Sequence, residues 1–184
     1  MKKLCLLILC LALLLTGCGS GREKERRQQL AEELSAGRDL RYTADVRAEY
    51  PDKTVSCRLS YEEDDEGCTI GVLEPEMIGG VSVRLGPDGA QLRFEEIRLD
   101  TGPLDRYGLS PLSALPALTR ALREGHLESV WTEGDLTVWE LIAGDHLTVQ
   151  VWLDEALTPQ RAELISDGRV SVFLEISDWR APSS

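Results

Sequence analysis

The cysteines are the residues of this chain most able to carry chemistry. Cys18 follows an uninterrupted apolar run over residues 4–15, which itself follows the two positive charges of Lys2 and Lys3. A helix needs about 20 apolar residues to cross a bilayer, so this run is too short to span one. A positive start, a short apolar core and small residues before a cleavage point are typical of a secretory signal peptide. We therefore expect residues 1–17 to be removed.

The four residues Leu15-Thr16-Gly17-Cys18 resemble the lipobox of bacterial lipoproteins. In that family the signal peptide is cut before the cysteine, whose thiol then carries a diacylglycerol. The resemblance implies a mature chain that begins at Cys18, carries covalent diacylglycerol and a further acyl chain such as palmitate, and is held at the extracytoplasmic side of a cell membrane. Each buried CH₂ adds about 0.8 kcal/mol, so two or three chains anchor a protein firmly. We expect no other cofactor.

Cys57 and Cys68 are the two thiols that remain once Cys5 and Cys10 have left with the signal peptide. Alternation along the flanking runs places both on one face of a predicted hairpin whose tip is the acidic stretch 62–66. Disulfides form readily outside the cytoplasm, so this pair is a candidate disulfide. The reduced state stays open as the alternative.

The other reactive residue types form no catalytic pattern. His126 and His146 belong to no HExxH motif or Cys/His cluster, so we expect surface histidines and no zinc site. The sequence holds no GxSxG elbow and no phosphate-binding glycine loop. The stretch 62–66 is contiguous, so alternate carboxylates point apart, which favours a solvated hairpin tip over a calcium loop. We therefore expect no metal and no enzymatic activity.

The charge of the chain limits its partners. The formal net charge is −12, and it becomes −14 when Lys2 and Lys3 leave with the signal peptide (18 basic against 32 acidic residues). Such a surface repels nucleic acid, so nucleic acid is excluded as a partner. The remaining length suits one domain. We expect a lipidated tether over 18–22, a single β-rich domain over 23–179 and a C-terminal tail over 180–184.

Periodicity predicts the elements that position these residues. Good helix formers predict a helix over 23–36, and strict alternation predicts a strand over 42–50. A second helix is predicted from Ser113, as its N-cap, to about Gly125, with Pro116 in its first turn. Similar alternating runs separated by turn residues predict strands over 53–61, 68–74, 80–86, 90–100, 127–133, 136–142, 146–153, 160–166 and 169–177. This is an α+β fold, mainly β with two or more helices, in which an antiparallel meander curls around helical packing.

The last strands carry large aromatic side chains on what alternation predicts to be the face opposite their aliphatic one. These candidates for a ligand or partner face are Trp131, Trp139, Trp152 and Phe173. Each can bury roughly 150–250 Å², so we do not expect this face to be fully exposed to solvent. Two interpretations stay open: helices cover the face and the aromatics are core, or the face lines a cavity or a partner groove.

The combined layout resembles LolA-like proteins. The resemblance rests on the lipobox, the N-terminal helix, the strand start Tyr42-Thr43-Ala44-Asp45, and Val151-Trp152-Leu153-Asp154 leading into residues 157–163. That family includes outer-membrane lipoprotein carriers and a spore-germination lipoprotein of clostridia. The resemblance implies an incomplete, strongly curved antiparallel β-barrel closed by helices. In the carriers, the concave face accepts lipoprotein acyl chains, and by matching position Trp139, Trp152 and Phe173 would face inward.

Two departures from the carriers weaken the expectation of a shuttle role. The chain has no convincing counterpart of the arginine beside the carrier cavity, and it has its own predicted anchor. The leading hypothesis is a non-catalytic binding module for an apolar ligand, a lipid or lipoprotein acyl chain, at the cell envelope. The germination relative is thought to bind a cell-wall amidase, so the alternative is a protein-binding scaffold that regulates a cell-wall enzyme.

Overall fold

The computed structural model describes residues 19–37, 39–87, 89–102 and 110–182. The predicted signal peptide and the lipidation site Cys18 lie outside these residues. The helices are α2 (Gly19–Ala36), the 3₁₀ turn η2 (Glu76–Ile78) and α3 (Pro111–Glu124). The strands are β1 (Arg41–Glu49), β2 (Thr54–Asp64), β3 (Gly67–Glu74), β4 (Ser82–Gly86), β5 (Gly89–Phe94), β6 (Ile97–Gly102), β7 (His126–Glu133), β8 (Leu136–Ile142), β9 (Leu147–Leu153), β10 (Pro159–Ser166) and β11 (Arg169–Arg180). Within the described ranges, no helix is both long and apolar enough to cross a membrane.

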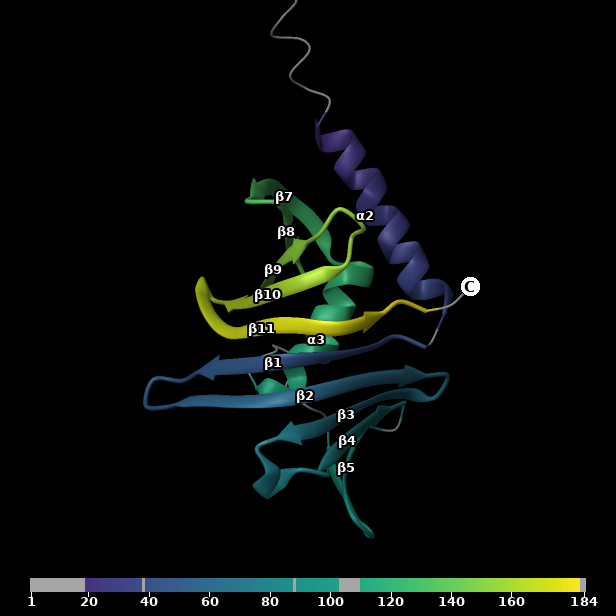
Figure 1. Cartoon of the computed structure of the whole chain (residues 1–184), viewed down its shortest axis with the longest axis vertical. Helices are drawn as coiled ribbons and strands as arrows, with labels where there is room; N and C mark the ends of the chain where they lie inside the picture. The colour runs from purple at the N-terminus through teal and green to yellow at the C-terminus, as the bar shows by residue number, and fades with distance from the viewer. Residues whose placement is uncertain (1–18, 38, 88, 103–109, 183–184) are drawn as a thin grey trace, which may run out of the picture.

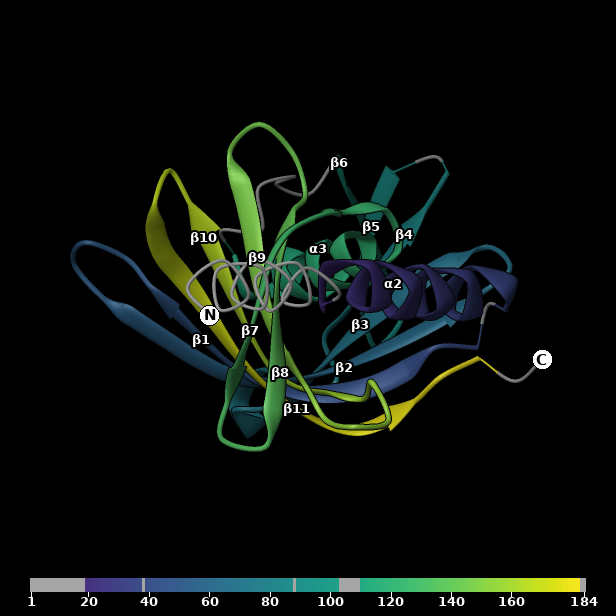
Figure 2. The same cartoon turned by 90° about the horizontal axis from the view of Figure 1, so that it is seen from above.

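All the strands belong to one antiparallel sheet of 11 strands, ordered β6-β5-β4-β3-β2-β1-β11-β10-β9-β8-β7. The chain winds outward from β1 to the edge strand β6. Helix α3 then carries it to the opposite edge at β7, and it winds back until β11 lies beside β1 (Figure 1). The sheet curls around α3 and α2 without closing (Figure 2). The predicted fold class, an incomplete and strongly curved antiparallel barrel with helices, is confirmed.

Over β1 to β3 and β8 to β11, the concave side of the sheet is packed against the helices. In β1, alternate residues from Tyr42 to Ala48 are buried while those between them face outward. Helix α3 contributes Leu115, Leu118 and Leu122, each at most 1% exposed, and α2 contributes Leu30 and Leu34. Fully burying one such side chain stabilises the fold by about 1.5–3 kcal/mol. This packing is what holds the sheet in its curved form.

A buried polar network joins the two helices to the sheet. The guanidinium of Arg123 donates to both carboxylate oxygens of Glu63 at 2.8 Å, and its Nη2 also donates to the carbonyl of Leu34 at 2.7 Å. Burial alone would lower the pKa of Arg123, but the hydrogen bond and charge of Glu63 raise it overall. In the same layer the hydroxyl of Tyr42 donates to the carbonyl of Leu115 at 2.9 Å. Helix α3 is therefore tied to α2, β1 and β2 at once.

The start of α3 differs from the prediction. Ser110, not Ser113, is the N-cap: its Oγ accepts from the backbone N–H of Ser113, and the Oγ of Ser113 accepts from the N–H of Ser110. This reciprocal capping box satisfies donors that a helix start leaves unpaired. The helix therefore begins earlier, and Pro116 lies in its interior rather than in the first turn.

Helix α2 and strand β11 also extend beyond their predicted bounds. Helix α2 begins at Gly19, so it runs through most of the stretch expected to be a tether. At the other end, β11 continues to Arg180, and Pro182 is buried beside Gly37. The single strand expected over 90–100 is a hairpin, because Glu95 adopts a positive φ of 51° in a turn between β5 and β6.

Candidate functional site

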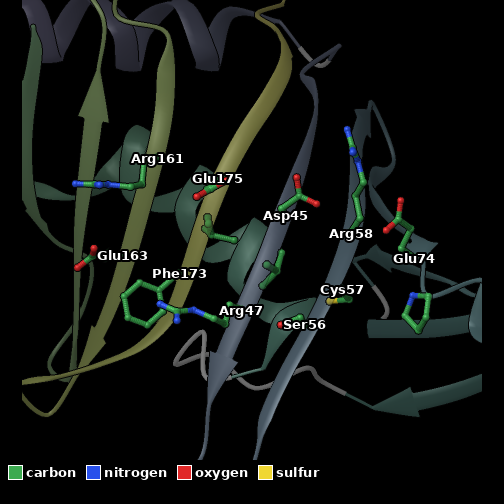
Figure 3. A pocket seen from close by; sticks show the side chains of 13 residues that line it. Asp45, Arg47, Ser56, Cys57, Arg58, Glu74, Arg161, Glu163, Phe173 and Glu175 are labelled. Carbon is green, nitrogen blue, oxygen red and sulfur yellow. The ribbon is translucent and has the colours of Figure 1, made fainter.

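A groove of about 690 Å³ crosses the outer face of the sheet, on the side away from α3. It runs over β10, β11, β1 and β2 to the end of β3, and Figure 3 shows its side chains standing in front of the strands with α3 behind them. Its charged lining residues are Asp45, Arg47, Arg58, Glu74, Arg161, Glu163 and Glu175. Phe173 and Pro75 are apolar members of the lining. The groove therefore carries both signs of charge beside apolar surface.

Strand register places these charges side by side. Asp45 lies opposite Glu175 on one neighbouring strand and opposite Arg58 on the other. The same row continues to Arg161 beyond Glu175 and to Glu74 beyond Arg58. Directly opposite residues in antiparallel strands have Cβ atoms about 4.5–5.5 Å apart. A ligand lying across the strands would therefore meet both carboxylates and guanidinium groups.

Phe173 lies in the middle of the groove under an arginine. The Cζ of Arg47 is 4.1 Å from the centroid of the Phe173 ring, and Figure 3 shows the guanidinium lying beside that ring. The Arg47 side chain is about half exposed and also reaches Glu49 at 3.4 Å. An exposed cation–π contact is worth only about 0.5–1 kcal/mol. The contact is therefore weak enough that the Arg47 side chain can move away from the ring.

A second arginine–aromatic pair limits the groove on the β9 side. The Cζ of Arg161 is 3.9 Å from the centroid of Trp152. Glu133 accepts from Trp152 Nε1 at 2.9 Å and from Arg161 Nη2 at 3.1 Å. The hydrogen bond from Trp152 is the largest cause of the lowered pKa of Glu133. Trp152 is only 4% exposed, so its ring forms a fixed wall, whereas the Arg161 and Glu133 side chains beside it are 41% and 54% exposed.

The four predicted aromatic residues do not share one face. Trp152 and Phe173 lie on the outer face, as does Trp131, which pairs with Val138 on β8 and is 36% exposed. Trp139 lies on the inner face, where it is fully buried opposite Val151.

The prediction that Trp139, Trp152 and Phe173 share an inward-facing side is therefore wrong, because Trp139 faces inward but Trp152 and Phe173 face outward. The register pairs Trp152 with Val138, so Trp139, one residue further along β8, points to the opposite side. Trp139 is core, and its Nε1 donates to Glu23 on α2 at 3.2 Å.

The candidate disulfide is also wrong, because Cys57 and Cys68 are both free thiols. The tight turn of the β2–β3 hairpin pairs Cys68 with Glu63, six residues along β2 from Cys57. At about 3.3 Å per residue this is roughly 20 Å, far beyond the reach of a disulfide. Burial raises the pKa of the Cys68 thiol to about 11.

The remaining titratable candidates form no reactive site. His126 and His146 are exposed, and His146 Nδ1 lies 3.1 Å from Asp167. No group of three His, Cys, Asp or Glu side chains could hold a metal ion in the part of the chain that the structure describes. In the acidic stretch, Asp64, Asp65 and Glu66 form the exposed tip, but Glu63 points into the core.

Sequence reasoning missed the residues that line the groove. The period-two pattern does place Asp45 and Arg47 on the outer side of β1. It does not show that Glu175, at the far end of the chain, pairs with Asp45. The signal for a charged face was present strand by strand, but the groove depends on which strands are neighbours.

Comparisons with known proteins give a likeness in fold. No protein-family model and no curated protein matches the sequence. The structure is similar to that of a LolA superfamily protein from Nitrosomonas europaea, with 12% identity and a TM-score of 0.43 over 87% of this chain and 94% of that one. It is similar to an uncharacterized conserved protein from Thermus thermophilus, with 10% identity and a TM-score of 0.48 over 85% and 88% of the two chains.

A third similar structure is that of the CwlD amidase from Clostridioides difficile in complex with the GerS lipoprotein. The matched chain is 16% identical, with a TM-score of 0.38 over 80% of this chain and 88% of that one. These similarities concern the fold alone.

Proposed function

We propose that this protein is a non-catalytic binding module, anchored by lipid on Cys18 at the extracytoplasmic face of a membrane, and that it binds a protein partner through the groove on its outer face. The observation that carries the proposal is the contrast between the two faces of the sheet. Over β1 to β3 and β8 to β11 the concave face is filled by α3 and α2, whereas the outer face is hollowed and carries charges of both signs.

An acyl chain is a poor fit to this arrangement. The apolar ligand suggested by the sequence needs an apolar chamber, but on the concave side, where a carrier would hold one, Trp139 and Leu118 are fully buried in the packed core. A chain laid in the outer groove would desolvate Asp45, Arg58 and Glu175. Removing a charge from water costs several kcal/mol unless a partner charge replaces the water, and an acyl chain offers none.

A polypeptide offers the groups that an acyl chain lacks. Its Lys and Arg side chains can pair with Asp45 and Glu175, its Asp and Glu side chains with Arg58 and Arg161, and one apolar side chain can take the place of Arg47 over Phe173. Opposite charges at an interface select the partner and speed its approach. In the Clostridioides difficile complex, a lipoprotein is assembled with an amidase. A cell-wall enzyme is the partner class to examine first.

Site-specific photocrosslinking in cells that make the protein tests the proposal. A photoreactive phenylalanine analogue replaces Ser56, which lines the groove, or Ser171, a matched serine on the outer side of β11 outside it. We expect one protein adduct from position 56 that Arg58→Glu abolishes. Arg169→Glu, an exposed arginine outside the groove, leaves the adduct unchanged.

A second measurement distinguishes the lipid hypothesis. Cys18→Ser removes the predicted anchor, so any acyl lipid in the native mass spectrum of that variant is bound non-covalently. We expect none. A stoichiometric lipid, together with no groove-dependent protein adduct, overturns the proposal and restores the apolar-ligand hypothesis.

A further inference from the structure

The edge strand β6 carries exposed apolar side chains, and among the described strands it pairs only with β5. Leu99 is 59% exposed, Ile97 is 63% exposed, and Phe94 on β5 is 37% exposed. Leu92 pairs with Leu99 and with the buried Val83, so these residues continue the inner, apolar face of the sheet beyond its helical cover. β6 is also the last strand of the sheet order. Exposed apolar edges of this kind favour pairing with another strand.

The residue order of β6 is complementary to itself. Arg98 and Asp100 stand on either side of Leu99, and both are exposed. If two copies of β6 pair antiparallel with Leu99 opposite itself, Arg98 faces Asp100 of the partner subunit, and Asp100 faces the partner's Arg98. Opposite charges directly across two strands stabilise the pair by roughly 0.2–1 kcal/mol, and like charges there destabilise it.

The backbone N–H and C=O groups of β6 alternate in the way that this register requires. The turn at Glu95 and Glu96 makes Phe94 and Ile97 the first pair of the β5–β6 hairpin. In a two-residue hairpin that first pair exchanges backbone hydrogen bonds, and hydrogen-bonded pairs then alternate along the strands. Arg98 and Asp100 therefore direct their N–H and C=O groups away from β5, toward a strand added at the edge. Arg98 and Asp100 therefore form both the charged pairs and the backbone hydrogen bonds with the added strand.

We propose that β6 is a self-recognition strand through which two copies of this chain form a two-fold symmetric dimer, with Leu99 on the symmetry axis. Each copy contributes the same surface, as an isologous interface requires. The pairing covers Leu99 and Ile97 of both copies. It leaves the outer groove over β10, β11, β1 and β2 free, so each dimer presents two copies of that groove. The dimer does not depend on the proposed partner.

Cysteine trapping in membranes tests the register with the full chain. Residues that face each other without hydrogen bonds have Cα atoms about 4.5 Å apart, which suits a disulfide. We expect Leu99→Cys to give a disulfide-linked dimer on mild oxidation. Leu73→Cys, an exposed leucine on the interior strand β3, controls for collisions and for the native thiols. Equal trapping of both variants, or an adduct of Leu99→Cys with a different protein, overturns self-pairing.

Charge exchange tests the same interface without a new thiol. Arg98→Asp and Asp100→Arg each place like charges opposite one another twice per dimer, so each should weaken dimerisation at least tenfold in sedimentation equilibrium of the detergent-solubilised protein. The double variant Arg98→Asp/Asp100→Arg restores both pairs and should recover most of the affinity. Single variants that dimerise like the wild type, or a wild type that is monomeric at tens of micromolar, overturn the proposal.

Discussion

At the scale of the residue, the most consequential contact is the buried charge pair of Glu63 and Arg123. Glu63 is one of five consecutive acidic residues, yet its side chain is 7% exposed and bound at two points by Arg123. A buried pair contributes little net stability compared with apolar side chains, but losing one partner leaves the other charge unpaired. The pair therefore fixes how α3 sits on β2.

Arg123→Met should lower the free energy of unfolding by about 3–5 kcal/mol, because it leaves the Glu63 carboxylate buried without a partner. Urea denaturation measures the change. Replacing both residues, Glu63→Leu with Arg123→Met, should recover most of it, since no charge is then left unpaired. Arg47→Met breaks the exposed contacts with Glu49 and with the Phe173 ring and is the control, with an expected loss of about 0.5–2 kcal/mol. Equal losses for the two single variants would contradict the buried-pair description.

At the scale of the element, the β2–β3 hairpin is held at its tip by a second arginine. Arg84 on β4 donates to both carboxylate oxygens of Asp64, at 2.6 and 2.7 Å, and the backbone N–H of Glu66 donates to the same carboxylate. The hydrogen bond from Arg84 is the largest cause that lowers the pKa of Asp64 to about 2. The contact joins strand β4 to the turn that sets the register of Cys68.

This hairpin should loosen in acid. The folded state holds the Asp64 proton less tightly than the unfolded state, whose pKa is near 3.8. The stabilisation is therefore complete above that value and is lost as pH falls toward 2. A carboxyl NMR titration should place the Asp64 pKa near 2 in the wild type and closer to 3.8 in Arg84→Gln. Arg93→Gln, on the neighbouring strand β5, should leave it unchanged. An ordinary Asp64 pKa in the wild type would refute the contact.

At the scale of the whole molecule, the central strands of the sheet are paired and packed on the helices, whereas the edge strand β6 is exposed. Strands β1, β11 and β10 are paired on both sides, and their inner residues lie against the helices. Strand β6 pairs on one side only within the described sheet and exposes Ile97 and Leu99. Local opening is easiest where few apolar contacts are buried.

Native-state hydrogen exchange should follow this gradient. Amides of residues 42–48 should exchange only through global unfolding, whereas those of residues 97–102 should exchange through local opening several kcal/mol lower in free energy. The measurement should use Arg98→Asp, because pairing of β6 with a second copy would protect the same amides. Protection of β6 equal to that of β1 in this variant would mean that the edge is covered in some other way.

Local sequence determined the elements of this fold and its class. Alternation over a few residues predicted nearly every strand, and turn residues predicted most of the connections, because both depend on interactions between near neighbours. The exceptions are segments in which two local signals compete. Ser110 and Ser113 are both good caps, and the reciprocal box selected Ser110. Within 90–100, the apolar residues continue on both sides of a turn that two glutamates, rather than glycine or asparagine, provide.

Only the tertiary structure decided which residues meet. The strand order brings β11 beside β1, which assembles the groove around Phe173, and the pairing of β8 with β9 places Trp139 in the core. The separation of Cys57 from Cys68, the Glu63–Arg123 pair and the row of charges around Asp45 follow from the same pairings. These contacts join residues far apart in the chain, and their energy depends on packing around α3, which no local pattern contains.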